Sequence, residues 1–331
     1  MQYRKLGNTD VDVSEISLGS WLTAAGGIDE QRIRECLDAA FECGINFFDT
    51  ANAYGQGAAE TIWGKLLSDR PRDSYVLATK VYSPMSDTDA GLSAAQIAKQ
   101  IDASLRRLDT DYVDVYYAHR FDVEVPIEET VEAFQKVVAQ GKARYLGFSE
   151  WTPEQIQAAV ALGGSDLFAA SQPQYSMLWQ APEDEVFDLC ASHQIAQVVW
   201  SPLAQGMLTG KYKAGEDLPA DSRFAHEEMN VAKGIVWNPA ALQAVERLSG
   251  AAKDADMALP QLALAWVLRR SEVASAIIGA SRAGQVRANV AASGITLDQS
   301  LLDAVDLALG DAAVRGQALA AGAAEGVRHR P

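Results

Sequence analysis

Four side chains of this sequence could together deliver a proton to a reacting oxygen. Asp49, Lys80 and His119 each follow a short apolar run, and Tyr54 lies five residues beyond Asp49. A free tyrosine has a pKa of about 10 and is a poor acid, but a neighbouring ammonium lowers that pKa. An aspartate paired with the lysine would keep the ammonium charged and in place. The tyrosine could then act as a general acid, and His119 could donate a hydrogen bond to the same oxygen.

Each of these residues also has a plainer explanation. An aspartate after a strand often caps a turn or helix, a lysine at a strand end is usually a solvated charge, and a single histidine is often structural. The chemistry therefore depends on whether the fold brings the four residues together.

The spacing of apolar residues predicts eight short strands alternating with longer helices. The strands are predicted at residues 16–19, 46–49, 75–80, 113–118, 143–148, 168–173, 196–200 and 274–278. The helices are predicted at residues 29–43, 58–67, 93–108, 126–140, 153–162, 182–193 and 259–268.

These strands are almost continuously apolar, which is typical of parallel strands buried on both faces. Eight units without a linker favour an α/β fold with one closed (β/α)8 TIM barrel over residues 1–310, followed by a loosely structured tail at 311–331. A doubly wound sheet is the alternative, but no G-x-G-x-x-G follows an early strand. In a barrel the carboxyl ends of the strands converge, so Asp49, Lys80 and His119 would meet.

Two segments depart from plain alternation. Residues 3–5 and 11–13 flank a Gly-Asn-Thr-Asp sequence, which predicts an N-terminal β-hairpin closing one end of the barrel. Residues 201–236 form a long loop between strands 7 and 8, rich in glycine, proline and mixed charge. Loops of that length inside a compact domain are usually functional.

Composition narrows the possible partners. The 331 residues carry a formal net charge of −16, which argues against nucleic acid. The N-terminus lacks a signal sequence, and no apolar run approaches the ~20 residues of a membrane helix. Cys36, Cys43 and Cys190 show no metal-ligand spacing. We expect a cytoplasmic protein without a metal, a nucleic-acid partner or a membrane partner; an oligomer is possible but has no sequence signature.

Several motifs together resemble those of the aldo-keto reductases. They are G-I-N-F-F-D-T-A-x-x-Y-G at 44–55, Lys80 and His119 after strands, and the segments 147–149, 172–175, 200–203, 211–212 and 278–281. Their order is closest to the branch that holds bacterial NADPH-dependent reductases and potassium-channel β subunits, and the resemblance covers about residues 1–310. It implies hydride transfer from NADPH to an aldehyde or ketone. Tyr54 would donate the proton, Lys80 would tune the pKa of Tyr54, Asp49 would pair with Lys80, and His119 would orient the carbonyl.

The resemblance also implies a cofactor site across the barrel mouth. Ser149 and Gln172 would bind the carboxamide and Trp200 the nicotinamide ring, while the loop carrying Lys211 and Arg223 would strap the pyrophosphate. Ser281 and Arg282 suit a 2′-phosphate, which favours NADPH over NADH. The full expected set is Ser20, Trp21, Asp49, Ser149, Gln172, Trp200, Ser201, Pro202, Leu203, Gln205, Gly206, Lys211, Arg223, Gly279, Ser281, Arg282, Gln285 and Asn289.

Plainer explanations exist here as well. Trp200 could be barrel core, the long loop could be an insertion with incidental basic residues, and Ser281 could be only a helix cap. Two positions depart from the family pattern. Ala288 stands where a glutamate often meets the adenine, and Glu150 stands where a basic residue or an amide is common.

The expected substrate is a small carbonyl compound with apolar or aromatic character. Its walls would be Trp21, Tyr54, Tyr82, His119 and Trp151, with Trp179 as a further candidate.

Two rival functions remain open. The first is a nucleotide-sensing, non-catalytic subunit resembling channel β subunits, some of which replace the histidine that this chain keeps as His119. The second is a Schiff-base lyase with Lys80 as nucleophile, which leaves Tyr54, Gln172 and Trp200 without a role.

Overall fold

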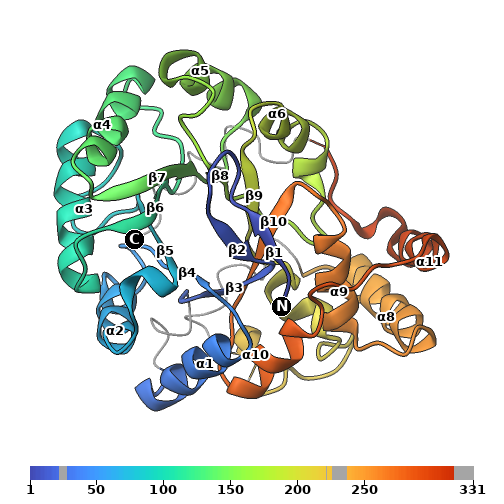
Figure 1. The fold of residues 1–331 in the computed structure, drawn as a ribbon. Helices are drawn as coiled ribbons and strands as arrows, with labels where there is room; N and C mark the ends of the chain where they lie inside the picture. The colour runs from blue at the N-terminus through green and yellow to red at the C-terminus, as the bar shows by residue number, and fades with distance from the viewer. Residues whose placement is uncertain (22–27, 221, 226–236, 317–331) are drawn as a thin grey trace.

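Eight parallel strands close into a barrel in the computed structural model, which describes residues 1–21, 28–220, 222–225 and 237–316. The strand order is β10-β3-β4-β5-β6-β7-β8-β9, and β10 closes the barrel by pairing with both β3 and β9 (Figure 1). The strands are β3 (Ile16–Gly19), β4 (Phe47–Asp49), β5 (Val76–Val81), β6 (Val113–Ala118), β7 (Ala143–Phe148), β8 (Ala170–Ser171), β9 (Ala196–Val199) and β10 (Val273–Ile278). The predicted TIM barrel is confirmed.

Helices surround this barrel (Figure 1). They are α1 (Glu30–Glu42), α2 (Ala58–Leu67), α3 (Ala94–Leu108), α4 (Ile127–Ala139), α5 (Pro153–Gly163), α6 (Val186–Ser192), α8 (Pro239–Asp254), α9 (Leu259–Leu268), α10 (Ala283–Val290) and α11 (Gln299–Leu309). Local sequence sets several starts: Thr152 and Gln155 form a capping box with Pro153 in the first turn, and Asp29 and Ser93 cap α1 and α3. Within the described ranges, no helix is both long and apolar enough to cross a membrane.

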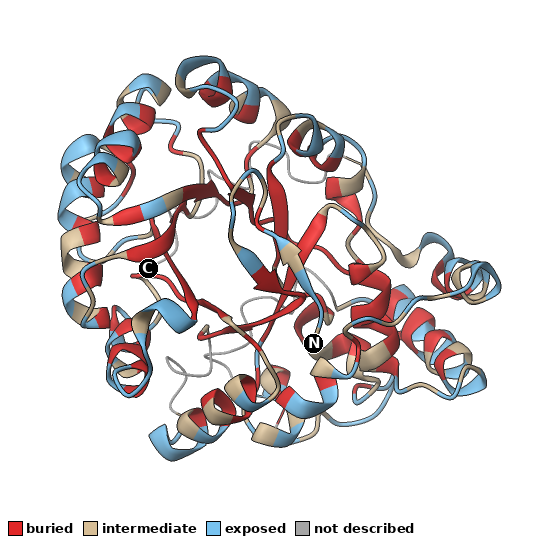
Figure 2. Cartoon of the chain, viewed as in Figure 1, coloured by how far each residue is buried: buried red, intermediate tan, exposed pale blue. Residues whose placement is uncertain are grey.

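The core has two layers, one inside the barrel and one between the strands and the helices. Neighbouring residues of one strand alternate between them: Phe47 and Tyr117 belong to the inner cluster, whereas Phe48 and Tyr116 belong to the outer one. Both faces of the strands are therefore buried, as Figure 2 shows. This explains why the sequence pattern of the strands is continuously apolar.

The predicted hairpin covers the amino-terminal end of the barrel. Strands β1 (Tyr3–Lys5) and β2 (Asp12–Ser14) pair antiparallel, and the side chains of Leu6 and Val13 join the inner cluster. Gly7 is required in the turn because its φ is +59° and a Cβ there would lie 2.3 Å from the carbonyl oxygen of Ala169.

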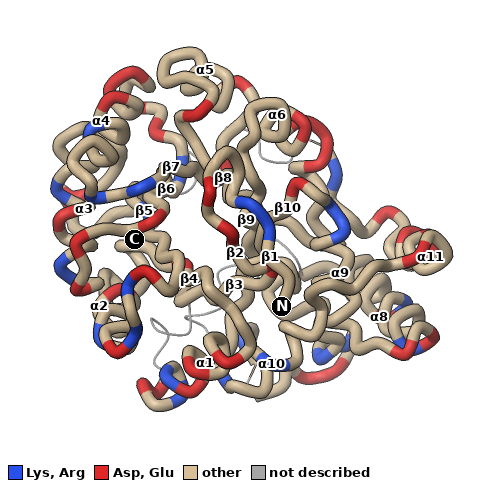
Figure 3. Tube along the Cα trace, viewed as in Figure 1, with Lys and Arg blue, Asp and Glu red and all other residues tan. Residues whose placement is uncertain are grey.

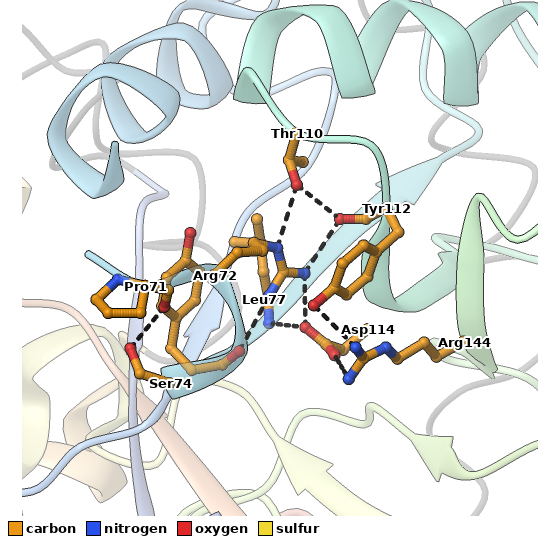
Figure 4. Close-up of polar contacts among 9 residues, drawn as sticks. Pro71, Arg72, Ser74, Leu77, Thr110, Tyr112, Asp114 and Arg144 are labelled. Atoms are coloured by element: carbon orange, nitrogen blue, oxygen red, sulfur yellow. Dashed lines mark hydrogen bonds and ion pairs between the residues drawn. The ribbon is translucent and has the colours of Figure 1, made fainter. Parts of the chain in front are cut away.

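A polar cluster ties β5 to β6 at this same end (Figure 4). The buried carboxylate of Asp114 accepts hydrogen bonds from Arg72 Nη2 at 2.7 Å, from the Leu77 backbone N–H at 2.9 Å and from Arg144 Nη1 at 3.2 Å. The Tyr112 ring lies 4.1 Å from the Arg72 guanidinium carbon and 4.2 Å from that of Arg144. We name these residues the Asp114 cluster. It lies at the opposite end of β5 and β6 from Lys80 and His119.

The structure departs from the predicted elements in several places. Helices α8 and α11 were not expected, strand β8 is shorter than predicted, and the helix predicted at 182–193 divides into a 3-10 turn, Ala181–Glu183, and α6. The predicted long loop contains two 3-10 turns, Ala204–Thr209 and Arg223–Ala225; residues 221 and 226–236 lie outside the described residues.

The start of the predicted tail contacts the domain. The Val314 N–H donates to the Leu178 carbonyl at 3.0 Å, and the Gln180 N–H donates to the Val314 carbonyl at 2.8 Å. Residues 317–331 lie outside the described residues.

Asp114→Ala should lower the free energy of unfolding by about 3 kcal/mol, because it leaves Arg72 and the Leu77 N–H without their buried acceptor. Urea unfolding followed by circular dichroism measures this change.

Glu30→Gln is the matched control. Glu30 binds Lys65 at the same distance of 2.7 Å, but its side chain is 46% exposed, whereas that of Asp114 is 3% exposed. We expect a loss below about 1 kcal/mol for the exposed pair. Equal losses in the two variants would show that the Asp114 cluster does not stabilise the barrel.

Candidate active site and cofactor cleft

The residues predicted to be catalytic meet at the carboxyl-terminal rim of the barrel. Asp49 ends β4, Lys80 is the penultimate residue of β5, and His119 directly follows β6. Backbone pairing continues past the strand ends: the N–H groups of His119, Ser149 and Gln172 donate to Val81, Ala118 and Phe148 at 2.8–2.9 Å. These backbone hydrogen bonds fix the positions of the residues whose side chains form the rim.

Lys80 is the centre of the group and is fully buried. Its ammonium Nζ lies 2.5 Å from Asp49 Oδ1, 2.8 Å from the Thr50 carbonyl oxygen and 3.3 Å from Tyr54 Oη. An ammonium has three N–H donors, and all three have an acceptor here. Burial alone would lower the pKa of Lys80, but Asp49 and Tyr54 hold it above its usual value, so the side chain stays charged.

Tyr54 lies on the turn between β4 and α2, beside His119. The two ring centroids are 5.7 Å apart in an edge-to-face arrangement. Burial raises the pKa of Tyr54 above its ordinary value of 10, while Lys80 and Arg120 act in the opposite direction. The Lys80 ammonium lowers the pKa of Tyr54 as expected, but desolvation of the phenolate outweighs that effect.

His119 is held neutral. Burial lowers its pKa well below 6.5, and the charges of Arg120 and Lys80 lower it further. Its Nδ1 atom is buried and has no hydrogen-bond partner in the described part of the chain. A neutral imidazole offers one N–H donor and one acceptor nitrogen.

A cavity of about 1450 Å³ opens above this group. Tyr54, His119 and Asp49 line its floor, and Lys80 lies beneath. The cavity is also lined by every residue expected to bind the cofactor except Ser20: Trp21, Asp49, Ser149, Gln172, Trp200, Ser201, Pro202, Leu203, Gln205, Gly206, Lys211, Arg223, Gly279, Ser281, Arg282, Gln285 and Asn289. Ser20 is buried below the lining, where its Oγ donates to Thr50 Oγ1 at 2.7 Å.

Three residues considered for the substrate pocket lie elsewhere. Trp151 is buried against the outside of the barrel, stacked on Phe148 at 5.2 Å and edge-on to Phe168 at 5.6 Å. Tyr82 is also buried and does not line the cavity, and neither does Trp179. Glu150, between the cavity residue Ser149 and the buried Trp151, is in a left-handed conformation with a φ of +58°.

Two charged cavity residues, Arg120 and Arg32, were not predicted from the sequence. Arg120 directly follows His119, and its Nη1 donates to the His119 carbonyl at 2.6 Å and to Ser149 Oγ at 3.3 Å. Its position next to a candidate catalytic residue was the available signal. Arg32 lies on α1, far from any motif, and no sequence signal indicates it.

Hydrogen bonds connect the catalytic group to the residues expected around the nicotinamide. Gln172 Nε2 donates to Asp49 Oδ2 at 2.9 Å, and Ser149 Oγ donates to the Gln172 carbonyl at 2.7 Å. Trp200 Nε1 donates to Glu150 Oε1 at 2.8 Å, which fixes the indole at the cavity wall. Glu150, the departure from the family pattern, thus positions Trp200.

The segment after Trp200 has an unusual backbone. Ser201, Ala204, Gln205 and Gly206 all have positive φ, between 46° and 96°. Such left-handed turns direct backbone N–H groups into concave surfaces that bind anions. Arg223, from the long loop, donates to Gln205 Oε1 and lies 5.8 Å from the Trp21 ring centre, so it closes over this segment.

The charge of the cavity is opposite to that of the whole chain. Five cationic residues line it, and Asp49 is the only carboxylate among the described lining residues; the cations are Arg32, Arg120, Lys211, Arg223 and Arg282. On the outer helices, basic and acidic residues are intermixed (Figure 3). In a protein with a net charge of −16, this concentration of positive charge favours a polyanionic ligand.

Comparisons with known proteins agree with this geometry. The model of the aldo/keto reductase family matches residues 15–309. A probable voltage-gated potassium channel subunit beta from Arabidopsis thaliana is 40% identical over 300 residues, covering 88% of this chain and 91% of that protein. L-glyceraldehyde 3-phosphate reductase from Escherichia coli K12 is 34% identical over 326 residues, covering 94% and 93%.

Two solved structures share the fold. A glycerol dehydrogenase from Gluconobacter oxydans superimposes with a TM-score of 0.80 at 28% identity, covering 93% of this chain and 94% of that one. An aldo-keto reductase from Bacillus halodurans, solved in its holo form, gives 0.77 at 31% identity, covering 96% and 99%.

His119 should remain neutral from about pH 8 to about pH 6, where an ordinary histidine gains most of its charge. The ring ¹⁵N chemical shifts of histidine-labelled protein measure this, and His119→Gln identifies the resonance. A titration centred near 6.5 would contradict the inferred burial of the imidazole.

Proposed function

The chain belongs to the aldo/keto reductase family, and we propose that it reduces aldehydes or ketones to alcohols with NADPH, with Tyr54 as the proton donor. The observation that carries this proposal is the placement of Lys80. A single buried ammonium contacts both Asp49 and Tyr54 on the floor of a cationic cavity.

The residues fit the proton transfer. Bound nicotinamide would supply the hydride that adds to the carbonyl carbon. As the electron pair of the C=O bond moves to oxygen, the Tyr54 hydroxyl donates its proton to that oxygen. The raised pKa of Tyr54 keeps this proton available at neutral pH, and Lys80 stabilises the phenolate that is left. Neutral His119 can donate a hydrogen bond to the same oxygen.

The residues also fit the dinucleotide. Ser149, Gln172 and Trp200 stand beside the catalytic group, where the nicotinamide would have to lie. The left-handed turns at Ser201–Gly206 and the cations Lys211 and Arg223 would hold the pyrophosphate. Ser281 and Arg282, at the start of α10, would hold the 2′-phosphate that distinguishes NADPH from NADH.

A second candidate function is a nucleotide-sensing subunit without catalytic turnover. It is favoured by the 40% identity to a protein described as a channel subunit beta. The complete set of Asp49, Tyr54, Lys80 and His119 on the cavity floor favours catalysis.

Tyr54→Phe should lower carbonyl reduction by about 10²–10⁴-fold, because it removes the proton donor. NADPH affinity should stay unchanged, since the Lys80–Asp49 pair remains. The measurements are NADPH consumption on a panel of aldehydes and ketones, and NADPH binding by fluorescence titration.

Tyr82→Phe removes the same hydroxyl from a buried tyrosine outside the cavity and is the control. If the unaltered protein binds NADPH and reduces none of the carbonyls, the sensing function replaces ours. Equal losses of turnover and affinity in Tyr54→Phe would contradict the assigned role.

Arg282→Ala should weaken NADPH binding about tenfold and leave NADH binding nearly unchanged, because it removes a charge-assisted contact to the 2′-phosphate. Calorimetry with both nucleotides measures the difference. Arg287→Ala, on the same helix but paired with Glu42 at 2.6 Å, should leave both affinities as they are. Equal weakening of NADPH and NADH would place Arg282 away from the phosphate.

A further inference from the structure

Helix α1 contributes to the same end of the cavity as α10. The two helices lie side by side (Figure 1), and Cys36 Sγ of α1 is 3.7 Å from the Ala280 carbonyl oxygen just before Ser281. Arg32 is one helical turn before Cys36 and therefore lies on the same side of α1. Arg32 and Arg282 both line the cavity.

Arg32 differs from neighbouring arginines in its pairing. Arg34 of α1 pairs with Asp69 at 3.4 Å, and Arg287 of α10 pairs with Glu42 at 2.6 Å. Within residues 1–21, 28–220, 222–225 and 237–316, Arg32 forms no ion pair. Arg32 is exposed and lines the cavity together with other cations. In an acidic chain, a cavity-lining guanidinium without a carboxylate partner among the described residues is placed to meet an anion.

This end of the cavity also contains no described carboxylate. Asp49, the one acidic residue of the described lining, belongs to the floor near Tyr54. Ala288, an uncharged residue of α10, also lines the cavity. With Arg32 and Arg282 in the lining and no described carboxylate beside them, the adenosine end is positively charged.

We propose that Arg32 is a specificity-determining residue that binds the 2′-phosphate of NADPH together with Arg282, so that two guanidinium groups from different helices share one phosphate. This rests on the proposed function, since it assigns the phosphate of that cofactor. A phosphate monoester is close to doubly charged at neutral pH, and the planar guanidinium fork matches its oxygens better than a point charge does.

The test separates the 2′-phosphate from the rest of the nucleotide. Calorimetry measures the Kd of NADPH and NADH, and of adenosine 2′,5′-bisphosphate and 5′-AMP, which differ only in the 2′-phosphate. Arg32→Ala should weaken NADPH and the bisphosphate about tenfold and leave NADH and 5′-AMP unchanged. Arg32→Lys should recover part of the loss because it restores the charge without the fork.

Arg34→Ala is the matched control, with the same substitution two residues along the same helix, and we expect no change in any of the four affinities. Thermal unfolding shows whether each variant keeps its fold.

Three outcomes would overturn the inference. Equal weakening of NADPH and NADH by Arg32→Ala would place Arg32 on the adenine instead of the phosphate. Unchanged affinity for all ligands would make Arg32 a solvated surface charge. If the unaltered protein binds neither NADPH nor NADH, the proposed function itself fails, a result distinguishable from the first two because it appears before any substitution.

Discussion

The buried ion pair between Lys80 and Asp49 is the constraint on which the rest of the site depends. Removing an ammonium and a carboxylate from water costs several kcal/mol for each ion, and the cost is offset only when every donor and acceptor is satisfied. Here the ammonium has three acceptors, and the carboxylate accepts a second hydrogen bond from Gln172. The geometry must therefore be kept, and that same geometry brings Tyr54 within reach of the ammonium.

The barrel keeps that geometry because the residues that stabilise β5 and β6 lie at one end of these strands and the catalytic residues lie at the other. At one end of β5 and β6 the Asp114 cluster fixes the two strands to each other, through the Leu77 N–H and two guanidinium groups. At the other end the strands present Lys80 and His119. The polar groups at the first end are satisfied internally, whereas His119 Nδ1 at the second end has no partner within the described residues. Tyr54 and His119 line the cavity, and there their remaining polar atoms can meet a ligand.

Much of the site could be predicted because strand ends are visible in the sequence. The continuous apolar runs located Asp49, Lys80 and His119, and parallel pairing requires such ends to share a rim. The helix α8 was missed because half of its buried residues are alanines, whose burial does not stand out in an apolar pattern. Trp151 was misplaced because its direction depends on the left-handed turn at Glu150, and the raised pKa of Tyr54 depends on burial that only the folded chain defines.

The charge of the cavity is a further property that could not be predicted from the sequence. Net charge describes what the surface repels over long distances, and here it is strongly negative. The cavity has the opposite sign because its arginines and lysine come from five separate segments: α1, the turn after β6, the start of the long loop, its distal part and the start of α10. None of these segments is basic by itself. An anion that approaches is repelled by most of the surface and attracted only at the barrel mouth, where the low dielectric of the walls strengthens each contact. An acidic exterior around a cationic cavity thus adds selectivity for where a polyanion binds, a property that arises from the fold and cannot be read from the order of charges along the chain.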